Sequence, residues 1–289
     1  MNNLNRTDFR FSERLRVRWS EVDAQKVVFN AHYLSYFDTA IAGYWRALAL
    51  PYEATLAALD GDLFVRKASL EYRSSARYDD LLDVGIRCRR IGNSSISFDA
   101  VAWRGATTVV AGELVYVFTD VAGQVPRPVP AALRTALERY EAGAPAVEVK
   151  VGRWAELGRD AQAIRSAVFV QEQGIPAELE WDAADAGAMH AVAINGVGAA
   201  VATGRWLDTD EPGVARIGRM AVLAPLRSGG VGRAVLDALV ASAREAGREA
   251  LMLHAQASAV AFYHRAGFEP VGPEFVEAGI PHQEMRRRL

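Results

Sequence analysis

Residues with distinctive chemistry are scarce in this chain of 289 residues. Cys88 is its only cysteine, so no disulfide can form within the chain. Cys88 also lies in a segment of alternating apolar residues, which favours a core position over a nucleophile. The five histidines are scattered and have no metal-ligand spacing, so we expect no metal site.

Long apolar runs and an excess of charge are missing as well. No stretch approaches the roughly 20 apolar residues that span a bilayer, and the N-terminus lacks the apolar centre of a signal peptide. We therefore expect a cytoplasmic protein with no membrane partner. The net charge of −2 gives no reason to expect nucleic acid, and the length is comfortable for two domains with a core each.

The segment 215–235 places a strand, a glycine-bearing loop and a helix start in immediate succession. Residues 217–222 alternate as a strand does, and Pro225 removes a backbone donor and ends it. Glycines without Cβ atoms then let consecutive backbone N–H groups curl around phosphate oxygens at the helix start. The loop consists of Arg227, Ser228, Gly229, Gly230, Val231 and Gly232.

Spacing separates this loop from other phosphate loops. A Walker A loop would end in Gly-Lys-Ser/Thr, whereas Gly232 is followed by Arg233. A dinucleotide fingerprint would place Gly or Ala where Val235 stands. An ordinary glycine-rich turn stays the plain alternative.

The first half begins with a predicted strand over 13–19, and apolar residues at helical spacing then predict a long helix over 30–48. Asn30 can cap this helix and Pro51 ends the pattern. Four alternating segments follow with tight turns between them, at 63–72, 80–91, 94–104 and 107–118. A strand, one long helix and a four-stranded meander are the element order of a hotdog fold.

Residues 9–140 resemble the hydroxybenzoyl-CoA thioesterase type of hotdog enzyme. The resemblance rests on Val17-Arg18-Trp19, Asp23, Val27-Val28, Asn30, Tyr33-Leu34, Tyr36-Phe37-Asp38, Tyr72 and Asp80. It implies that Asp23 attacks an acyl-CoA thioester or activates water, while backbone N–H groups at the helix start, at Asn30 and Ala31, polarise the carbonyl. Many members carry Gly where this chain has Lys26, which puts the loop geometry in question. A loop-capping role for Asp23 and a hotdog hydratase or dehydratase are the alternatives.

The second half alternates strands and helices as an α/β sheet does. Strands are predicted at 148–154 and 249–253, a hairpin at 189–206, and helices at 161–173, from Val231 onward and at 257–264.

This half resembles a GNAT N-acetyltransferase throughout. The resemblance rests on Val222, Pro225, Arg227, Gly230 and Gly232, on 169–176, on Ala255-Gln256-Ala257, on 262–268 and on 279–282. It implies that Arg227 to Arg233 hold the pyrophosphate of coenzyme A, and that Met220, Ala221 and Val222 pair with its pantetheine. It also implies that Tyr263 gives a proton to the departing thiolate; packing under the sheet is the plain alternative for this tyrosine.

An amine acceptor also requires a base. Glu172 is the first candidate, because the resemblance places its segment near the acceptor cleft. Glu178, Glu180 and Asp182 are equally available, and acidic loop residues are mostly solvated.

The sequence thus predicts an α+β hotdog thioesterase domain at 1–144, followed by an α/β GNAT domain with a mixed sheet at 145–289. The expected function is acyl-CoA hydrolysis by the first and acyl transfer to an unidentified amine by the second. The alternative for the second domain is a non-catalytic coenzyme A sensor that regulates the first. We expect a homodimer or homotetramer through the hotdog domain.

Overall fold

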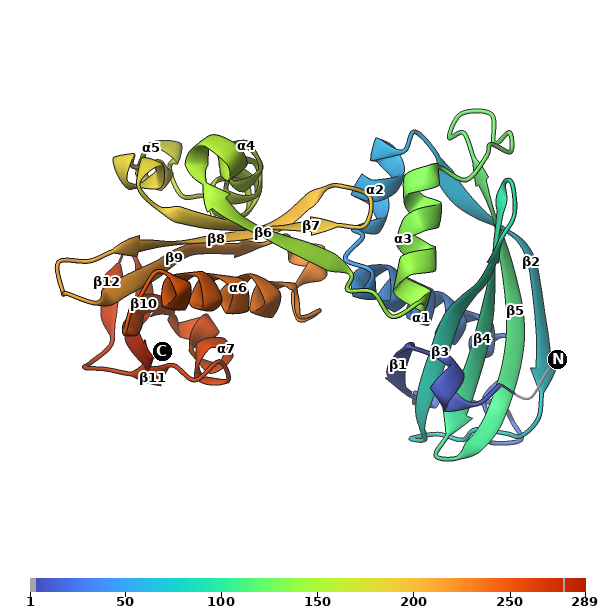
Figure 1. Ribbon diagram of the computed structural model, residues 1–289. Coiled ribbons are helices and arrows are strands. Elements are labelled where there is room, and N and C mark those ends of the chain that lie inside the picture. The colour runs from blue at the N-terminus through green and yellow to red at the C-terminus, as the bar shows by residue number, and fades with distance from the viewer. Residues whose placement is uncertain (1–3, 278) are drawn as a thin grey trace. The chain divides into compact units, whose positions relative to one another are not determined.

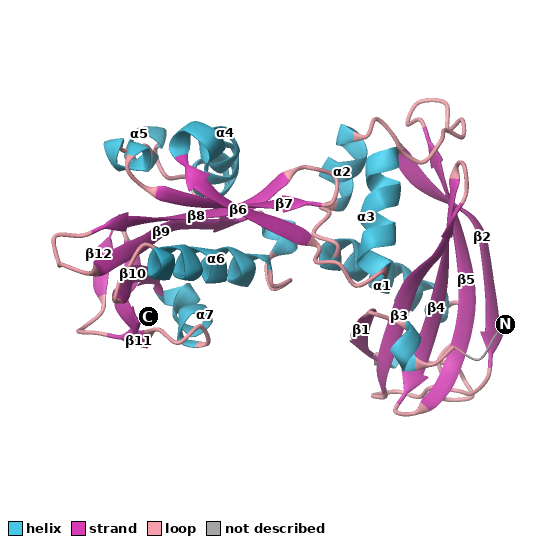
Figure 2. Cartoon of the chain, in the orientation of Figure 1, coloured by secondary structure: helices cyan, strands magenta, loops and turns pink. Residues whose placement is uncertain are grey.

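The computed structural model describes residues 4–277 and 279–289. A long helix, α1 (His32–Ala47), is the centre of the first part of the chain, and its Phe37, Tyr44 and Trp45 are almost fully buried. An antiparallel sheet of order β1-β3-β4-β5-β2 wraps this helix (Figures 1 and 2). This arrangement confirms the predicted hotdog fold. The strands are β1 (Phe11–Arg16), β2 (Asp62–Tyr72), β3 (Leu81–Ile91), β4 (Ser95–Arg104) and β5 (Thr107–Thr119).

Helices flank this framework, and one of them was not expected. The helix α1 ends before Pro51, as predicted, but Pro51 is also the N-cap of a second helix, α2 (Tyr52–Ala58). Proline suits a helix start because it supplies no N–H, and the first N–H groups of a helix have no partner within it. A third helix, α3 (Ala131–Glu141), follows the sheet. The first strand begins and ends earlier than predicted, and Trp19–Glu21 form a 3-10 turn instead.

A mixed sheet of order β11-β13-β10-β9-β8-β7-β6 organises the second part of the chain, with β12 paired to β13. The pair β9 and β10 is parallel. Helices α4 and α5 cover one face of the sheet, and α6 and α7 cover the other (Figure 1). The bounds are β6 (Val147–Arg153), α4 (Trp154–Arg165), α5 (Ala177–Glu180), β7 (Met189–Asn195), β8 (Ala200–Asp208), β9 (Val214–Val222), α6 (Val231–Glu245), β10 (Ala250–Gln256), α7 (Val260–His264), β11 (Glu269–Pro270), β12 (Phe275–Glu277) and β13 (Ile280–Arg288).

Several elements of this part differ from the sequence-based prediction, among them α4 and β13, while α5, β11 and β12 were not predicted. The helix predicted from residue 161 begins at Trp154, directly after β6, and continues beyond Arg165 as a π-helix, Ser166–Glu172. Strand β13 was not predicted, because it is rich in charged residues. Its pairing with β10 along seven positions, Ala250↔Arg288 to Gln256↔His282, brings it into the sheet.

The chain divides into two compact units, the first ending at Ala146 and the second comprising Val147–Leu289. The segment before this division is a helix C-terminus, where Gly143 takes φ +93° and the N–H of Ala144 donates to Arg139 O. Arg10 donates to the carbonyl oxygens of Tyr140 and Ala144 at 2.5 and 2.6 Å and so holds this turn. In the described part of the chain, no helix has the length and apolar character needed to cross a bilayer.

Candidate active sites

Asp23 lies in a tight loop that is closed by a bridge between Val22 and Val28. Its backbone N–H donates to Val27 O at 2.9 Å, and its Oδ1 accepts the N–H of Gln25 at 2.9 Å. Oδ2 accepts no backbone hydrogen bond from the described residues. With its side-chain amide oriented to donate, Gln25 lies 3.0 Å from Oδ2, so Asp23 caps its own loop and its second carboxylate oxygen faces an exposed glutamine.

Free backbone donors lie between this loop and α1. Asn30 and Ala31 are exposed, and their N–H groups have no acceptor among the residues described. The N-cap of α1 is Ala31, so the prediction of Asn30 as cap was wrong; the carbonyl of Asn30 accepts the Tyr72 hydroxyl at 3.2 Å. The Tyr36 hydroxyl donates to Glu21 at 2.6 Å and ties the loop to α1. Free N–H groups at a helix start suit a developing oxyanion.

Lys26 occupies the position where many hotdog relatives carry glycine. Its φ is +62°, in the left-handed region where glycine has no steric penalty. The loop therefore has the backbone conformation that glycine would favour, with a lysine in it. The N–H of Lys26 donates to Asp23 O at 2.9 Å and closes the turn.

The glycine-bearing loop of the second unit leads into α6. Ser228 and Gly230 take φ +66° and +85°, which makes the backbone curl. The N–H of Ala234 donates to Gly230 O at 3.0 Å, and the preceding N–H groups of Val231, Gly232 and Arg233 have no acceptor within the helix. A Cβ on Gly232 would lie 3.1 Å from Val222, so this residue allows the helix to approach β9. Free N–H groups at a curled helix start suit an anion.

Strands β9 and β10 separate next to this loop. Their parallel register runs from Ala250↔Val214 to Met252↔Arg216 and goes no further. Beyond this register, β9 has a bulge in which Arg219 takes φ +52°. The Met220 sulfur packs against Gly204 of β8, where there is no space for a Cβ atom. The separated part of β9 contains Met220, the buried Ala221 and Val222, which the sequence assigned to pantetheine.

A cavity of about 310 Å³ lies at this separation. Ile217 to Met220 of β9 line it, together with residues of the π-helix, β10, α7, β12 and β13. Tyr263 is one of the lining residues; it is 8 % exposed, and burial raises its pKa. Among the described residues its hydroxyl has no hydrogen-bond partner. The phenol therefore stays protonated in the cavity, as a proton donor must.

The structure places Glu172 beside the predicted phosphate loop. Both its carboxylate oxygens accept hydrogen bonds from Arg227, at 2.6 and 2.7 Å. The hydrogen bond to Arg227 lowers the pKa of Glu172, and Glu172 is not among the residues that line the cavity. Arg233, further along, pairs with Asp237 at 2.8 Å.

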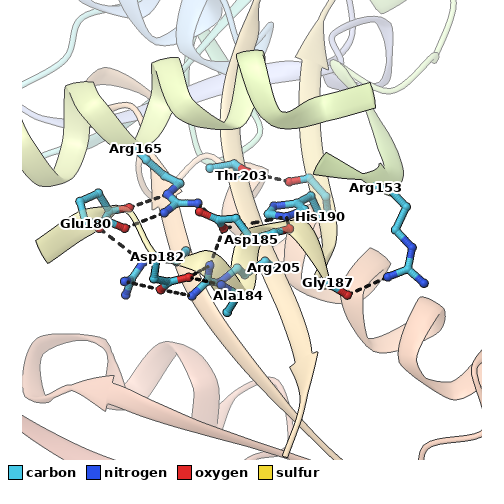
Figure 3. A network of polar contacts seen from close by, with 12 residues as sticks. Arg153, Arg165, Glu180, Asp182, Ala184, Asp185, Gly187, His190, Thr203 and Arg205 are labelled. Carbon is cyan, nitrogen blue, oxygen red and sulfur yellow. Dashed lines mark hydrogen bonds and ion pairs between the residues drawn. The ribbon is translucent and has the colours of Figure 1, made fainter. Parts of the chain in front are cut away.

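Of the other acidic candidates, Glu180 and Asp182 belong to a polar network (Figure 3), whereas Glu178 is exposed and does not line the cavity. Glu180 is 3 % exposed and pairs with Arg165 at 2.5 Å, which corrects the expectation that acidic loop residues are solvated here. Arg205 pairs with Asp182 and Asp185, and its hydrogen bond to Asp182 lowers the pKa of that carboxyl to about 2. These carboxylates pair with the guanidinium groups of Arg165 and Arg205.

The cavity also contains groups that sequence reasoning missed. His254 of β10 and Glu277 of β12 line it and lie 3.0 Å apart, from Nδ1 to Oε2. Arg216 of β9 and His282 of β13 line it too. His254 directly precedes the motif at 255–257, and Glu277 lies just before the motif at 279–282. Only the folded sheet brings these two side chains together.

Within the described residues, no three His, Cys, Asp or Glu side chains converge as a metal site. Cys88 is partly buried, and burial raises the pKa of its thiol to about 12, which leaves it unreactive.

Comparisons with known proteins match each unit separately. A family model described as acetyltransferase (GNAT) domain matches residues 158–289, and one described as thioesterase superfamily matches residues 25–111. The chain is 38% identical over 130 residues to the uncharacterized N-acetyltransferase YjcF of Bacillus subtilis, covering 45% of this chain and 91% of that protein. It is 26% identical over 131 residues to the acyl-CoA thioesterase YbgC of Haemophilus influenzae, covering 45% and 96%.

Solved structures match in the same way. A putative N-acetyltransferase from Lactobacillus plantarum has 28% identity and a TM-score of 0.47, covering 50% of this chain and 98% of that one. A thioesterase from Thermus thermophilus, complexed with coenzyme A and Zn, has 26% identity and a TM-score of 0.41, covering 48% and 98%.

Proposed function

The chain belongs to the GNAT acetyltransferase family through residues 158–289 and carries a thioesterase-superfamily domain at residues 25–111, and from this we propose that it is a bifunctional acyl-CoA enzyme. The first unit would hydrolyse an acyl-CoA thioester. The second would transfer an acetyl or acyl group from coenzyme A to an amine. The two substrates share the coenzyme, and the proposal includes no metal.

The observation that carries the hydrolase proposal is the position of Asp23 just ahead of the free N–H groups of Asn30 and Ala31. A carboxylate can attack the thioester carbon or take a proton from water, and the N–H groups stabilise the oxyanion that forms. The test is release of free thiol from acyl-CoA by the full chain. A hotdog hydratase would instead change an enoyl-CoA without releasing thiol.

In the second unit, the free N–H groups of Val231, Gly232 and Arg233 would hold the pyrophosphate, together with Arg227, Ser228, Gly229 and Gly230. The pantetheine would follow Met220 to Val222 and bring the thioester to the cavity. Tyr263 would give its proton to the departing sulfur.

The observation that favours transfer over a coenzyme A sensor is the content of this cavity. A sensor needs only the phosphate loop, whereas the cavity adds a buried phenol and further titratable groups beyond it. The test uses the Asp23→Asn chain, so that hydrolysis by the first unit cannot imitate transfer. Amine-dependent thiol release from acetyl-CoA supports the transferase; binding of coenzyme A without it favours the sensor.

We also propose that the first unit forms at least a dimer. Its edge strand β2 exposes Phe64, Val65 and Tyr72, which are 36, 55 and 51% accessible. The Tyr72 hydroxyl contacts Asn30 at the start of α1, so a partner strand on this edge would also lie close to the proposed site. Light scattering at micromolar concentration tests this, and a monomer would contradict it.

Finally, we propose that the two units fold independently, as domains at 1–144 and 145–289. Limited proteolysis near residue 145 should give two folded fragments. We propose the cytoplasm as the place of action.

A further inference from the structure

His254 Nδ1 lies between a carboxylate and a guanidinium group. A hydrogen bond with Glu277 Oε2 at 3.0 Å places the proton on Nδ1, because a carboxylate oxygen only accepts. A hydrogen bond from Arg216 Nη2, also 3.0 Å away, would need Nδ1 unprotonated, because a guanidinium only donates. We assign the proton to Nδ1 on the contact with Glu277, and Arg216 is then a neighbouring cation that lies 4.0 Å from Glu277 Oε1. The neutral ring then has its lone pair on Nε2.

Packing fixes the orientation of this ring. Phe275, two residues before Glu277 on β12, meets the His254 ring edge to face with centroids 4.8 Å apart. Strand β12 pairs with β13 from Phe275↔His282 to Glu277↔Ile280, so one ladder positions both contacts of His254. The side chain of His254 is 23% exposed, which leaves it within reach of a ligand in the cavity.

We propose that His254 is the base that deprotonates the acceptor amine, and that Glu277 is its positioning residue. This inference rests on the proposed acyl transfer by the second unit. Of the alternative acids, Glu172 is held by Arg227, and Glu180, which also lines the cavity, is held by Arg165. Glu178 and Asp182 do not line the cavity. His282 donates from Nδ1 to Ile280 O at 2.8 Å, and no carboxylate supports it among the described contacts.

In the proposed acyl transfer, the acceptor amine enters as an ammonium ion, and His254 Nε2 takes one of its protons. The amine lone pair forms a bond to the thioester carbon while the carbonyl electron pair moves to oxygen. Collapse of this intermediate breaks the C–S bond; Tyr263 gives its proton to sulfur and regains one from the nitrogen. The products are an amide, a free thiol and a protonated His254, which returns its proton to water.

Kinetics of the His254→Gln variant test the base role, with all chains carrying Asp23→Asn. We expect kcat/KM for the amine to fall by roughly 10²- to 10⁴-fold at neutral pH, with the KM for acetyl-CoA changed less than about twofold. The acidic limb of the pH–rate profile should disappear. His264→Gln is the matched control, because His264 is 61% exposed and is not among the cavity-lining residues; it should change nothing.

Activity that survives His254→Gln within about threefold, or a reduced rate that keeps its acidic limb, would overturn the base assignment alone. If the chain that carries only Asp23→Asn shows no amine-dependent thiol release, the transferase proposal is wrong, and the assignment of His254 as its base is wrong with it. The two failures are therefore distinct.

Nitrogen-15 NMR of the His254 ring tests whether Glu277 sets its tautomer, and it needs no amine substrate. We expect His254 in the Nδ1–H form, and Glu277→Ala should return it to the mixture of a free imidazole while lowering the transfer rate. Glu277→Gln, which keeps an accepting oxygen, should preserve the Nδ1–H form. A ring protonated on Nε2 in the unaltered protein would refute the arrangement.

Discussion

Glu172 and Arg227 hold each other through two parallel hydrogen bonds of 2.6 and 2.7 Å. The third directed donor of Arg227, Nε, goes to Val222 O at 3.1 Å. The pair joins the end of the π-helix to the predicted phosphate loop. The two residues that the sequence assigned to opposite substrates, the amine and the pyrophosphate, therefore share one interaction.

Glu172→Gln should consequently act on coenzyme binding more than on chemistry. Both side chains are about 40% exposed, at 40 and 42%, and such a pair is worth about 1 kcal/mol or less because water screens it. Releasing Arg227 should lower the KM for acyl-CoA by up to about fivefold and leave kcat within about threefold. Steady-state kinetics beside the exposed Glu245→Gln control measure this. A loss of about 10²-fold in kcat would restore Glu172 as the base.

Asp23→Asn should abolish thioester hydrolysis while the chain still binds acyl-CoA. The amide keeps an oxygen that can accept from Gln25 N–H, so the loop remains capped. It cannot serve as nucleophile or base, and the rate should fall by at least about 10²-fold. Thiol release and calorimetric binding are the measurements, with an unchanged melting temperature as control. A normal rate would assign Asp23 to loop capping only.

Lys26→Gly should stabilise the first unit slightly. The left-handed conformation costs an L-residue roughly 1–2 kcal/mol, and glycine returns about 0.5–1 kcal/mol of that as chain entropy. We expect a gain of up to about 1 kcal/mol, whereas the β-branched Lys26→Val should destabilise. Scanning calorimetry of the first unit's transition measures both. A destabilised glycine variant would show that the lysine side chain stabilises the loop.

The sequence predicts the elements whose pattern is local. The helix α1 is recognisable because its apolar residues recur at helical spacing, and the loop before α6 is recognisable because its glycines are closely spaced. The start of α2 was missed because Pro51 was interpreted only as a terminator. Leu34 matched the apolar stripe but is 39% exposed at the helix surface.

The acceptor-side groups could not be predicted in this way. His254 and Glu277 are 23 residues apart, and neither has a local motif. Their contact depends on β13, a strand rich in charged residues that has no strand pattern in its sequence and is recognised only by its pairing with β10. Glu180 was likewise ambiguous, because only the tertiary structure brings Arg165 to it.

Tyr263→Phe should lower acyl transfer by about 10²-fold or more, since it removes the proposed proton donor. Burial raises the pKa of Tyr263, so the phenol should stay protonated throughout the neutral and moderately alkaline range. Among the described residues its hydroxyl makes no hydrogen bond, and the phenylalanine should therefore fold normally. Transfer rates with one acylated amine, alongside melting temperatures, are the measurements. An unchanged rate would leave Tyr263 as a packing residue.

His190 should make the second unit sensitive to mild acid. It is 1% exposed and lies between Asp185, whose carbonyl is 3.0 Å from Nε2, and the Trp154 ring. Burial lowers the pKa of His190, the nearby Arg205 and Arg165 lower it further, and Asp185 opposes them without cancelling the shift.

Because the folded state holds His190 neutral, the unfolded chain binds more protons below the ordinary histidine pKa of about 6.5. The stability that depends on neutral His190 is then complete above about pH 6.5 and is lost as the pH falls through the lowered pKa of the folded state. The lowered pKa of Asp182 affects stability in a separate pH range, between its ordinary pKa of 3.8 and about 2. Calorimetry of the second unit between pH 7.5 and about 5 should therefore show a falling melting temperature, which His190→Gln should flatten. A melting temperature of the unaltered protein that stays constant across this range would contradict the assignment of a buried neutral His190.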